Sequence, residues 1–157
     1  IPNRVIDDCN IAKLIKEKGD IWLGLTNRVQ SKRRYSNLKE IWKMVSRTAF
    51  EQLNHSIIQL LLSLLGLFIV YVFPYLGLIY SLQNFETNAL SKLLISINII
   101  SISMMVFTFL PTVKFYKIAK FFTLTLPLSA LMYGCMTLSS AVNYCFFEGN
   151  NWKGRKY

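Results

Sequence analysis

Three long apolar runs dominate the second two thirds of the chain, at residues 56–82, 93–113 and 121–147. A membrane-crossing helix needs about 20 apolar residues to pass a hydrocarbon core roughly 30 Å thick. Each run is therefore long enough for one crossing and too short for two. The pattern predicts a mainly α-helical membrane protein with three transmembrane helices.

Within these runs, several residues predict how the helices bend and pack. Three prolines should kink or end the helices because proline lacks the N–H of the helical ladder; they are Pro74, Pro111 and Pro127. Ala130 and Gly134 lie one turn apart and should let the third helix approach a neighbour closely. Asn98 and Asn143 are polar, so we expect both to face the helix bundle.

Ahead of the first run, residues 37–55 have the pattern of an amphipathic helix between Leu38 and Leu53. Its apolar face contains Leu38, Ile41, Trp42, Val45, Ala49 and Leu53. Lys39, Lys43 and Arg47 follow one another beside this face. The pattern is typical of a helix lying in the membrane interface, with cations on the headgroups. A helix packed on a preceding soluble domain would have the same pattern, and both interpretations remain open.

The first 36 residues have a mixed α/β pattern. Asp7 and Asp8 precede apolar residues at helical spacing, and Gly19 can end the helix. The following run DIWLGLTNRV, residues 20–29, is rich in strand-forming side chains and leads into a polar, basic loop. We therefore expect residues 1–36 to be the C-terminal edge of an α/β domain.

Charge lies on either side of the apolar runs and not among them. Residues 1–55 carry a net charge of +5, residues 56–113 carry 0, and residues 114–157 carry +5. Cations flanking apolar helices argue for a membrane protein and against a nucleic-acid binder. The leading segment and the second connection, with Lys114, should share the cytoplasmic side. The basic tail, residues 148–157, conflicts with three crossings unless one segment is re-entrant or lies along the surface.

The cysteines and the single histidine predict neither a disulfide nor a structural metal site in this chain alone. Cys135 and Cys145 are ten positions apart on one helix, about 15 Å along its axis, which is too far to bridge. His55 has no histidine or Cys-x-x-Cys partner from which to build a zinc site.

Several stretches together resemble the C-terminal part of membrane-bound family 2 glycosyltransferases. They are IDDCNIAKLIKEKGDIWLGLT, RVQSKRRYSNLKEIWKMVSRTAFEQL, the apolar spans and the closing WKGRKY. The chain is most similar to the hopene-associated glycosyltransferases and more distantly to ceramide glucosyltransferases. The resemblance implies a GT-A type domain that transfers a sugar, with inversion, from a nucleotide-diphosphate donor to a lipid acceptor. It also implies a divalent metal, Mg or Mn, and a role in hopanoid synthesis.

The resemblance also implies which residues do the chemistry. In the family an acidic pair precedes a helix that ends near a glycine, and its second member is the general base. Asp8 occupies that position, with Asp7 as its companion, although an acidic pair at a helix start is also a common N-terminal cap.

A second family element, Gln-x-x-Arg-Trp, matches this chain only at Arg47, because Met44 and Thr48 stand at its other positions. Arg47 is a candidate for the donor phosphates or the acceptor site, as are Gln30, Arg33 and Arg34 in the basic loop. Contact with anionic headgroups is the alternative role for these cations.

The chain has no Asp-x-Asp motif and no glycine-rich phosphate loop. We therefore expect the metal ligands and the nucleotide pocket to precede Ile1, and this part alone to be inactive. The resemblance places the whole enzyme in a bacterial inner membrane with its catalytic part cytoplasmic. The competing hypothesis is a small three-span membrane protein that binds or scaffolds a partner and catalyses nothing.

Overall fold

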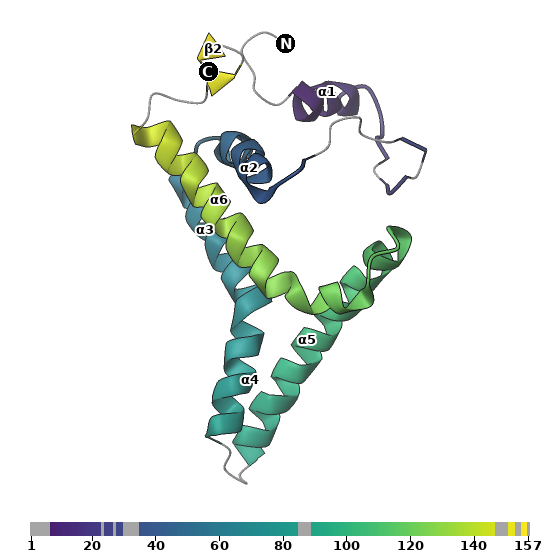
Figure 1. Cartoon of the computed structure of the whole chain (residues 1–157), viewed down its shortest axis with the longest axis vertical. Helices are drawn as coiled ribbons and strands as arrows, with labels where there is room; N and C mark the ends of the chain where they lie inside the picture. The colour runs from purple at the N-terminus through teal and green to yellow at the C-terminus, as the bar shows by residue number, and fades with distance from the viewer. Residues whose placement is uncertain are drawn as a thin grey trace. The chain divides into compact units, whose positions relative to one another are not determined.

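The computed structural model describes residues 7–22, 24–26, 28–29, 35–84, 89–146, 151–152 and 155–156. Most of these residues are helical (Figure 1). The helices are α1 (Asp7–Lys16), α2 (Leu38–Gln52), α3 (Ile57–Leu67), the π-helix η1 (Phe68–Val72), α4 (Phe73–Gln83), α5 (Ala89–Phe115), the 3-10 helix η2 (Lys120–Thr125) and α6 (Leu126–Phe146). Two short strands follow, β1 (Asn151–Trp152) and β2 (Arg155–Lys156), paired antiparallel.

The prediction of three long apolar helices is confirmed. Three helical stretches are long and apolar enough to cross a membrane: Ile57–Gln83, Ala89–Phe115 and Lys120–Phe146. Each differs by a few residues from the run that the sequence indicated. The chain is therefore a helical membrane protein.

The chain divides into two compact units, one made of residues 1–56 and 136–157 and the other of residues 57–135. Helix α1 of the first unit begins at Asp7 and carries Lys13 and Lys16 in its last turn, where cations favour the negative end of the helix dipole. It ends at Lys16, shortly before Gly19, as the sequence predicts.

The prediction of a strand at residues 20–29 is wrong at every position there that the structure describes. Residues 20–22, 24–26 and 28–29 form no strand. A strand is stable only when a neighbour takes up its backbone hydrogen bonds, and the described part of the chain supplies none for this segment. Trp22, which should pack on such a sheet, is 85% exposed. No edge of an α/β domain is therefore seen.

Helix α2 begins where the sequence predicts, and its start is fixed by side chains. Asn37 is the N-cap, and its side chain accepts a hydrogen bond from the N–H of Glu40 at 3.0 Å. The Glu40 carboxylate in turn accepts from the N–H of Ser36 at 3.0 Å. This reciprocal arrangement satisfies backbone donors that would otherwise lack partners at the helix start, as in a capping box.

The other end of α2 packs on the last part of α6. Ser46, Ala49 and Phe50 are the buried residues of α2. The backbone N–H of Phe50 donates to the Ser140 hydroxyl at 3.0 Å, and Ser140 is fully buried. Of the predicted apolar face only Ala49 is buried, and the residue that bonds α6, Phe50, was not part of that face. Leu38 and Ile41 stay exposed.

In the second unit, two of the three prolines disturb or begin a helix as predicted. Pro74 lies in the first turn of α4, directly after the π-helix. Here the N–H of Phe73 donates to the carbonyl of Phe68, five residues back. Pro127 is the second residue of α6, where its missing N–H costs nothing. Pro111 lies inside α5, which continues through it to Phe115.

Small and polar residues let the helices of this unit approach closely. Helices α4 and α5 run side by side (Figure 1). A Cβ atom placed on Gly77 would lie 2.8 Å from the Asn98 side-chain oxygen. Asn98 is buried, as predicted, and its amide group donates to the Leu94 carbonyl at 2.9 Å. Gly134 lies beside Leu64, whose Cδ2 would be 3.4 Å from an added Cβ, an ordinary contact distance; the predicted close packing of α6 stays a prediction.

Candidate functional site

The acidic pair singled out by the sequence lies at the start of α1. Asp7 and Asp8 are the first two residues of this helix. A carboxylate at a helix N-terminus is stabilised by the positive end of the helix dipole. Their side chains lie outside what the structure describes, so no contact of either carboxylate is known.

The basic loop also lies outside the described residues. Gln30, Arg33 and Arg34 all fall there. Of the predicted site residues, only Arg47 has a described side chain, so the structure does not test whether the others lie near it.

Arg47 differs from the two lysines that share its predicted stripe. Lys39 and Lys43 are exposed, as expected for cations that meet headgroups or water. Arg47 is half-buried, and its Nε atom is buried. It follows Ser46 and lies within one turn of Phe50, both buried, and the Phe50 N–H bonds Ser140 of α6. Arg47 is therefore partly enclosed by its surroundings, whereas the two lysines are not.

The two neighbours of Arg47 in the family element are occupied by local contacts. The Met44 sulfur accepts a hydrogen bond from the Tyr35 hydroxyl at 2.8 Å. The Thr48 hydroxyl donates to the Met44 carbonyl at 3.2 Å. Neither contact reproduces the hydrogen bonding of a glutamine or the stacking of a tryptophan. If this element acts on a ligand, its charge comes from Arg47.

The described residues do not fit a divalent metal. No group of three or more His, Cys, Asp or Glu side chains lies together among them. Cys135 and Cys145 are both free thiols. This part of the chain, where it is described, supplies no metal ligand set.

Sequence reasoning missed an aromatic cluster that joins the two ends of the first unit. The His55 ring stacks on the Tyr144 ring at 4.0 Å between centroids. Phe50 meets both rings edge-on, at 5.4 Å from His55 and 5.5 Å from Tyr144. His55 has a positive φ of 55°, in the turn that follows α2. The sequence signal for this cluster was Phe50, an apolar residue on the buried face of α2. Nothing in the sequence pointed to Tyr144.

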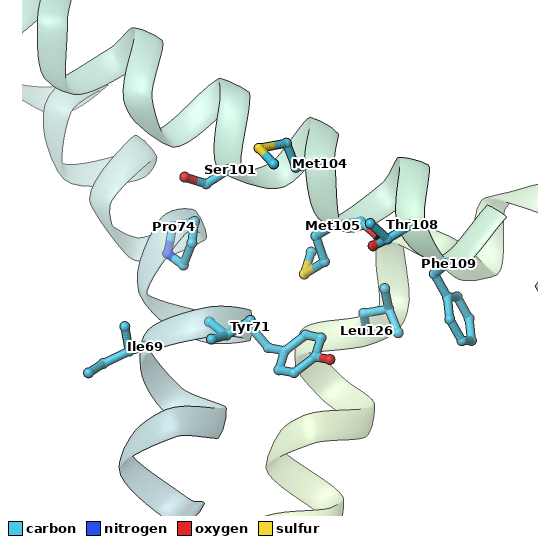
Figure 2. A pocket seen from close by; sticks show the side chains of 10 residues that line it. Ile69, Tyr71, Pro74, Ser101, Met104, Met105, Thr108, Phe109 and Leu126 are labelled. Carbon is cyan, nitrogen blue, oxygen red and sulfur yellow. Dashed lines mark hydrogen bonds between the residues drawn. The ribbon is translucent and has the colours of Figure 1, made fainter. Parts of the chain in front are cut away.

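The second unit contains an open, mostly apolar cavity of about 450 Å³. Its walls come from η1 and the start of α4, from the second half of α5, and from Leu126 at the start of α6 (Figure 2). In Figure 2 the side chains of Tyr71, Met105 and Leu126 border the same space from these three sides. The hydroxyls of Ser101 and Thr108 donate to carbonyls of their own helix, at 2.9 and 3.0 Å. The lining is therefore effectively apolar.

Comparison with known proteins identified no relative of this chain. No protein-family model matches the chain, and no curated protein and no solved structure matches it either. The apolar helices define the class, a helical membrane protein. A more specific activity is therefore inferred from the residues and fold of the chain itself.

Proposed function

We propose that this chain is the C-terminal, membrane-embedded part of an inverting glycosyltransferase. The enzyme moves a sugar from a nucleotide-diphosphate donor to a lipid acceptor, with hopanoid-type lipids as the acceptor class that the resemblance suggests. The observation that carries the proposal is the order of elements in one chain. An acidic pair opens α1, a basic amphipathic helix α2 with a half-buried arginine follows, and apolar helices come next.

Asp8 acts as the general base in this proposal. The acceptor hydroxyl gives its proton to the Asp8 carboxylate while its oxygen attacks the anomeric carbon. The bond from that carbon to the donor diphosphate breaks, and the diphosphate leaves with the electron pair. Because attack and departure occur on opposite faces of the sugar, the configuration inverts. A positioned carboxylate contributes a factor of about 10² to 10⁴ to such a step.

Arg47 is assigned to the diphosphate or to the acceptor site. A guanidinium forms paired hydrogen bonds to phosphate oxygens and stabilises the charge that grows on the leaving group. Arg47 is half-buried and lies one turn before Phe50, which bonds Ser140 of α6, and this supports a charge held in a fixed place. Arg33, Arg34 and Gln30 in the preceding loop are candidates for the same phosphates.

The apolar helices would keep this chemistry beside a substrate that does not leave the bilayer. A lipid acceptor is concentrated in the membrane, so an enzyme anchored there meets it without extracting it into water. A divalent metal and the nucleotide pocket belong, in this proposal, to the part of the enzyme that precedes Ile1.

The test is a transfer assay on the complete gene product in native membranes. Radiolabelled nucleotide-diphosphate sugars are supplied, and label in the lipid extract is measured. We expect label to enter a lipid, and Arg47→Ala to reduce this transfer while leaving the amount of protein in the membrane unchanged; Lys43→Ala is the matched control on the exposed face. If no donor labels any lipid, the three-span scaffold is the better description.

A further inference from the structure

We infer that the third apolar helix does not complete a crossing: α6 returns to the side of the membrane on which α3 begins. This inference concerns how the chain is threaded through the bilayer and stands without the proposed transferase activity. On this path most of the positive charge lies on one side of the membrane, where it would contact anionic lipid headgroups.

The first observation is the contact between the two ends of the apolar region. His55 lies two residues before α3 begins at Ile57, and Tyr144 lies two residues before α6 ends at Phe146. Their rings are stacked at 4.0 Å. The hydrogen bond from Phe50 to Ser140 joins the same two segments. Three successive crossings would put the end of α6 on the opposite side from His55, across about 30 Å of hydrocarbon.

The second observation comes from the other unit and is independent of the first. Leu64 of α3 contacts Gly134 of α6. Further along, Tyr71 and Leu126 line the same cavity. As the residue number rises along the first apolar helix it falls along α6, so the two helices run antiparallel. Adjacent first and third crossings of a three-span protein would run parallel.

The depth of the cavity shows where α6 starts. Tyr71 lies near the middle of the stretch Ile57–Gln83, and Ser101 near the middle of Ala89–Phe115. Both line the cavity together with Leu126, the first residue of α6. Leu126 is therefore near the middle of the bilayer. The 21 residues of α6 then have only half of the bilayer to pass before they end beside His55.

The third stretch also differs from the other two in composition and burial. It is the least apolar of the three, and a larger share of it is buried, 28% against 11% for each of the others. Segments that enter a bilayer without crossing it are tolerated where protein covers them. The preceding 3-10 helix, Lys120–Thr125, leads into the bilayer from the connection that contains Lys117.

This path removes the conflict between the charges and the number of crossings. With two crossings, residues 1–56, the connection after α5 and the tail all share one side. The whole net charge of +10 then lies on that side, whereas the opposite side has only the connection after α4, with Glu86, and the nearby Lys92. Such an asymmetry is what the positive-inside rule expects of cytoplasmic segments.

The cationic side fits the anionic phosphate groups of the cytoplasmic leaflet. Lys39 and Lys43 are exposed on α2 beside the exposed apolar residues Leu38 and Ile41. Apolar side chains can enter the acyl boundary while the lysines meet headgroup phosphates, each contributing about 1 kcal/mol.

Membrane-impermeant maleimide labelling tests the path. In a background with Cys9, Cys135 and Cys145 replaced by serine, one cysteine is placed at Asn84, Lys117 or Asn151 of the full-length protein. Labelling is compared in intact and permeabilised cells. We expect Lys117→Cys and Asn151→Cys to share one side and Asn84→Cys to lie on the other. If Asn151→Cys shares the side of Asn84→Cys, the inference is wrong.

A crosslinking pair provides a readout that does not depend on labelling efficiency. In the same background, His55→Cys with Tyr144→Cys should be joined by a short bifunctional thiol reagent, whereas Asn84→Cys with Tyr144→Cys should not. The reverse result would overturn the inference even if the labelling were ambiguous.

A lipid-retention measurement tests whether the cationic side binds anionic headgroups. The purified full-length protein is reconstituted in nanodiscs with phosphatidylcholine and phosphatidylglycerol, and the phosphatidylglycerol retained on detergent extraction is counted at low salt. Replacing Lys39 and Lys43 together by alanine should reduce retention by about thirtyfold, and Lys92→Ala should leave it unchanged. Equal retention in all three proteins would remove the headgroup assignment.

Discussion

The imidazole ring of His55 lies flat on the phenol ring of Tyr144, with the ring planes 17° apart and the centroids separated by 4.0 Å. One residue precedes the first apolar helix, and the other lies in the last turns of the third. A turn with positive φ at Asn54 and His55 presents the imidazole to Tyr144. The two ends of the membrane-embedded region are thereby joined through side chains.

Tyr144→Ala should weaken this junction, and Tyr144→Phe should not. Alanine removes the ring that contacts both His55 and Phe50, and aromatic pairs contribute about 0.5–1.5 kcal/mol each beyond the area that they bury. Phenylalanine keeps both ring contacts. We expect a lower unfolding temperature in detergent for the alanine variant alone. Equal losses for both variants would show that the hydroxyl, and not the ring, makes the contact.

Ser140→Ala should destabilise the packing of α2 on α6. Ser140 is fully buried and its hydroxyl accepts from the Phe50 N–H, so alanine removes the acceptor without adding atoms to the site. Loss of such a buried hydrogen bond costs about 1–3 kcal/mol. Thermal unfolding in detergent measures the loss. Ser129→Ala is the control, because that hydroxyl is exposed and bonds only its own helix at Thr125; a similar loss there would contradict the assignment.

Gly77→Ala should force α4 and α5 apart. The added Cβ would lie 2.8 Å from the Asn98 oxygen, and Asn98 is held by its own hydrogen bond and by burial. Overpacking of this kind costs about 1–3 kcal/mol. Gly66→Ala, which meets open space, should be neutral or slightly stabilising.

The double variant Gly77→Ala with Asn98→Ala distinguishes this steric cause from a change in helix propensity. Removing the Asn98 amide frees the space that the new methyl needs. Much of the stability lost in the single glycine variant should then return. If the two losses simply add, the glycine is not required for the approach of the asparagine.

Much of the membrane-embedded architecture follows from the sequence because it depends on local composition. The three apolar helices and the buried Asn98 needed only residue types and their spacing. The strand at residues 20–29 failed because strand formation depends on a partner that local sequence does not contain. The reversal of α6 depends on long-range contacts such as Leu64 with Gly134, which spacing along one helix does not reveal.

The candidate site was predictable only as separate residues. The sequence identified Arg47 as a cation on the stripe of α2, but its partial burial beside the buried Ser46 and Phe50 depends on tertiary packing that the stripe does not reveal. The partners of Met44 and Thr48 likewise depend on the conformation of the preceding chain and of the helix backbone. The relationship of Asp8 to Arg47 stays a prediction, because the Asp8 side chain lies outside the described structure.

The most direct test of the proposed activity compares Asp8→Asn with Asp7→Asn in the complete gene product. Both substitutions remove one charge at the start of α1, so they alter the helix terminus alike. We expect Asp8→Asn to reduce transfer of labelled sugar to lipid by about 10² to 10⁴, with donor binding retained, and Asp7→Asn to reduce it much less. Unchanged turnover in Asp8→Asn would contradict the role of this carboxylate as the base.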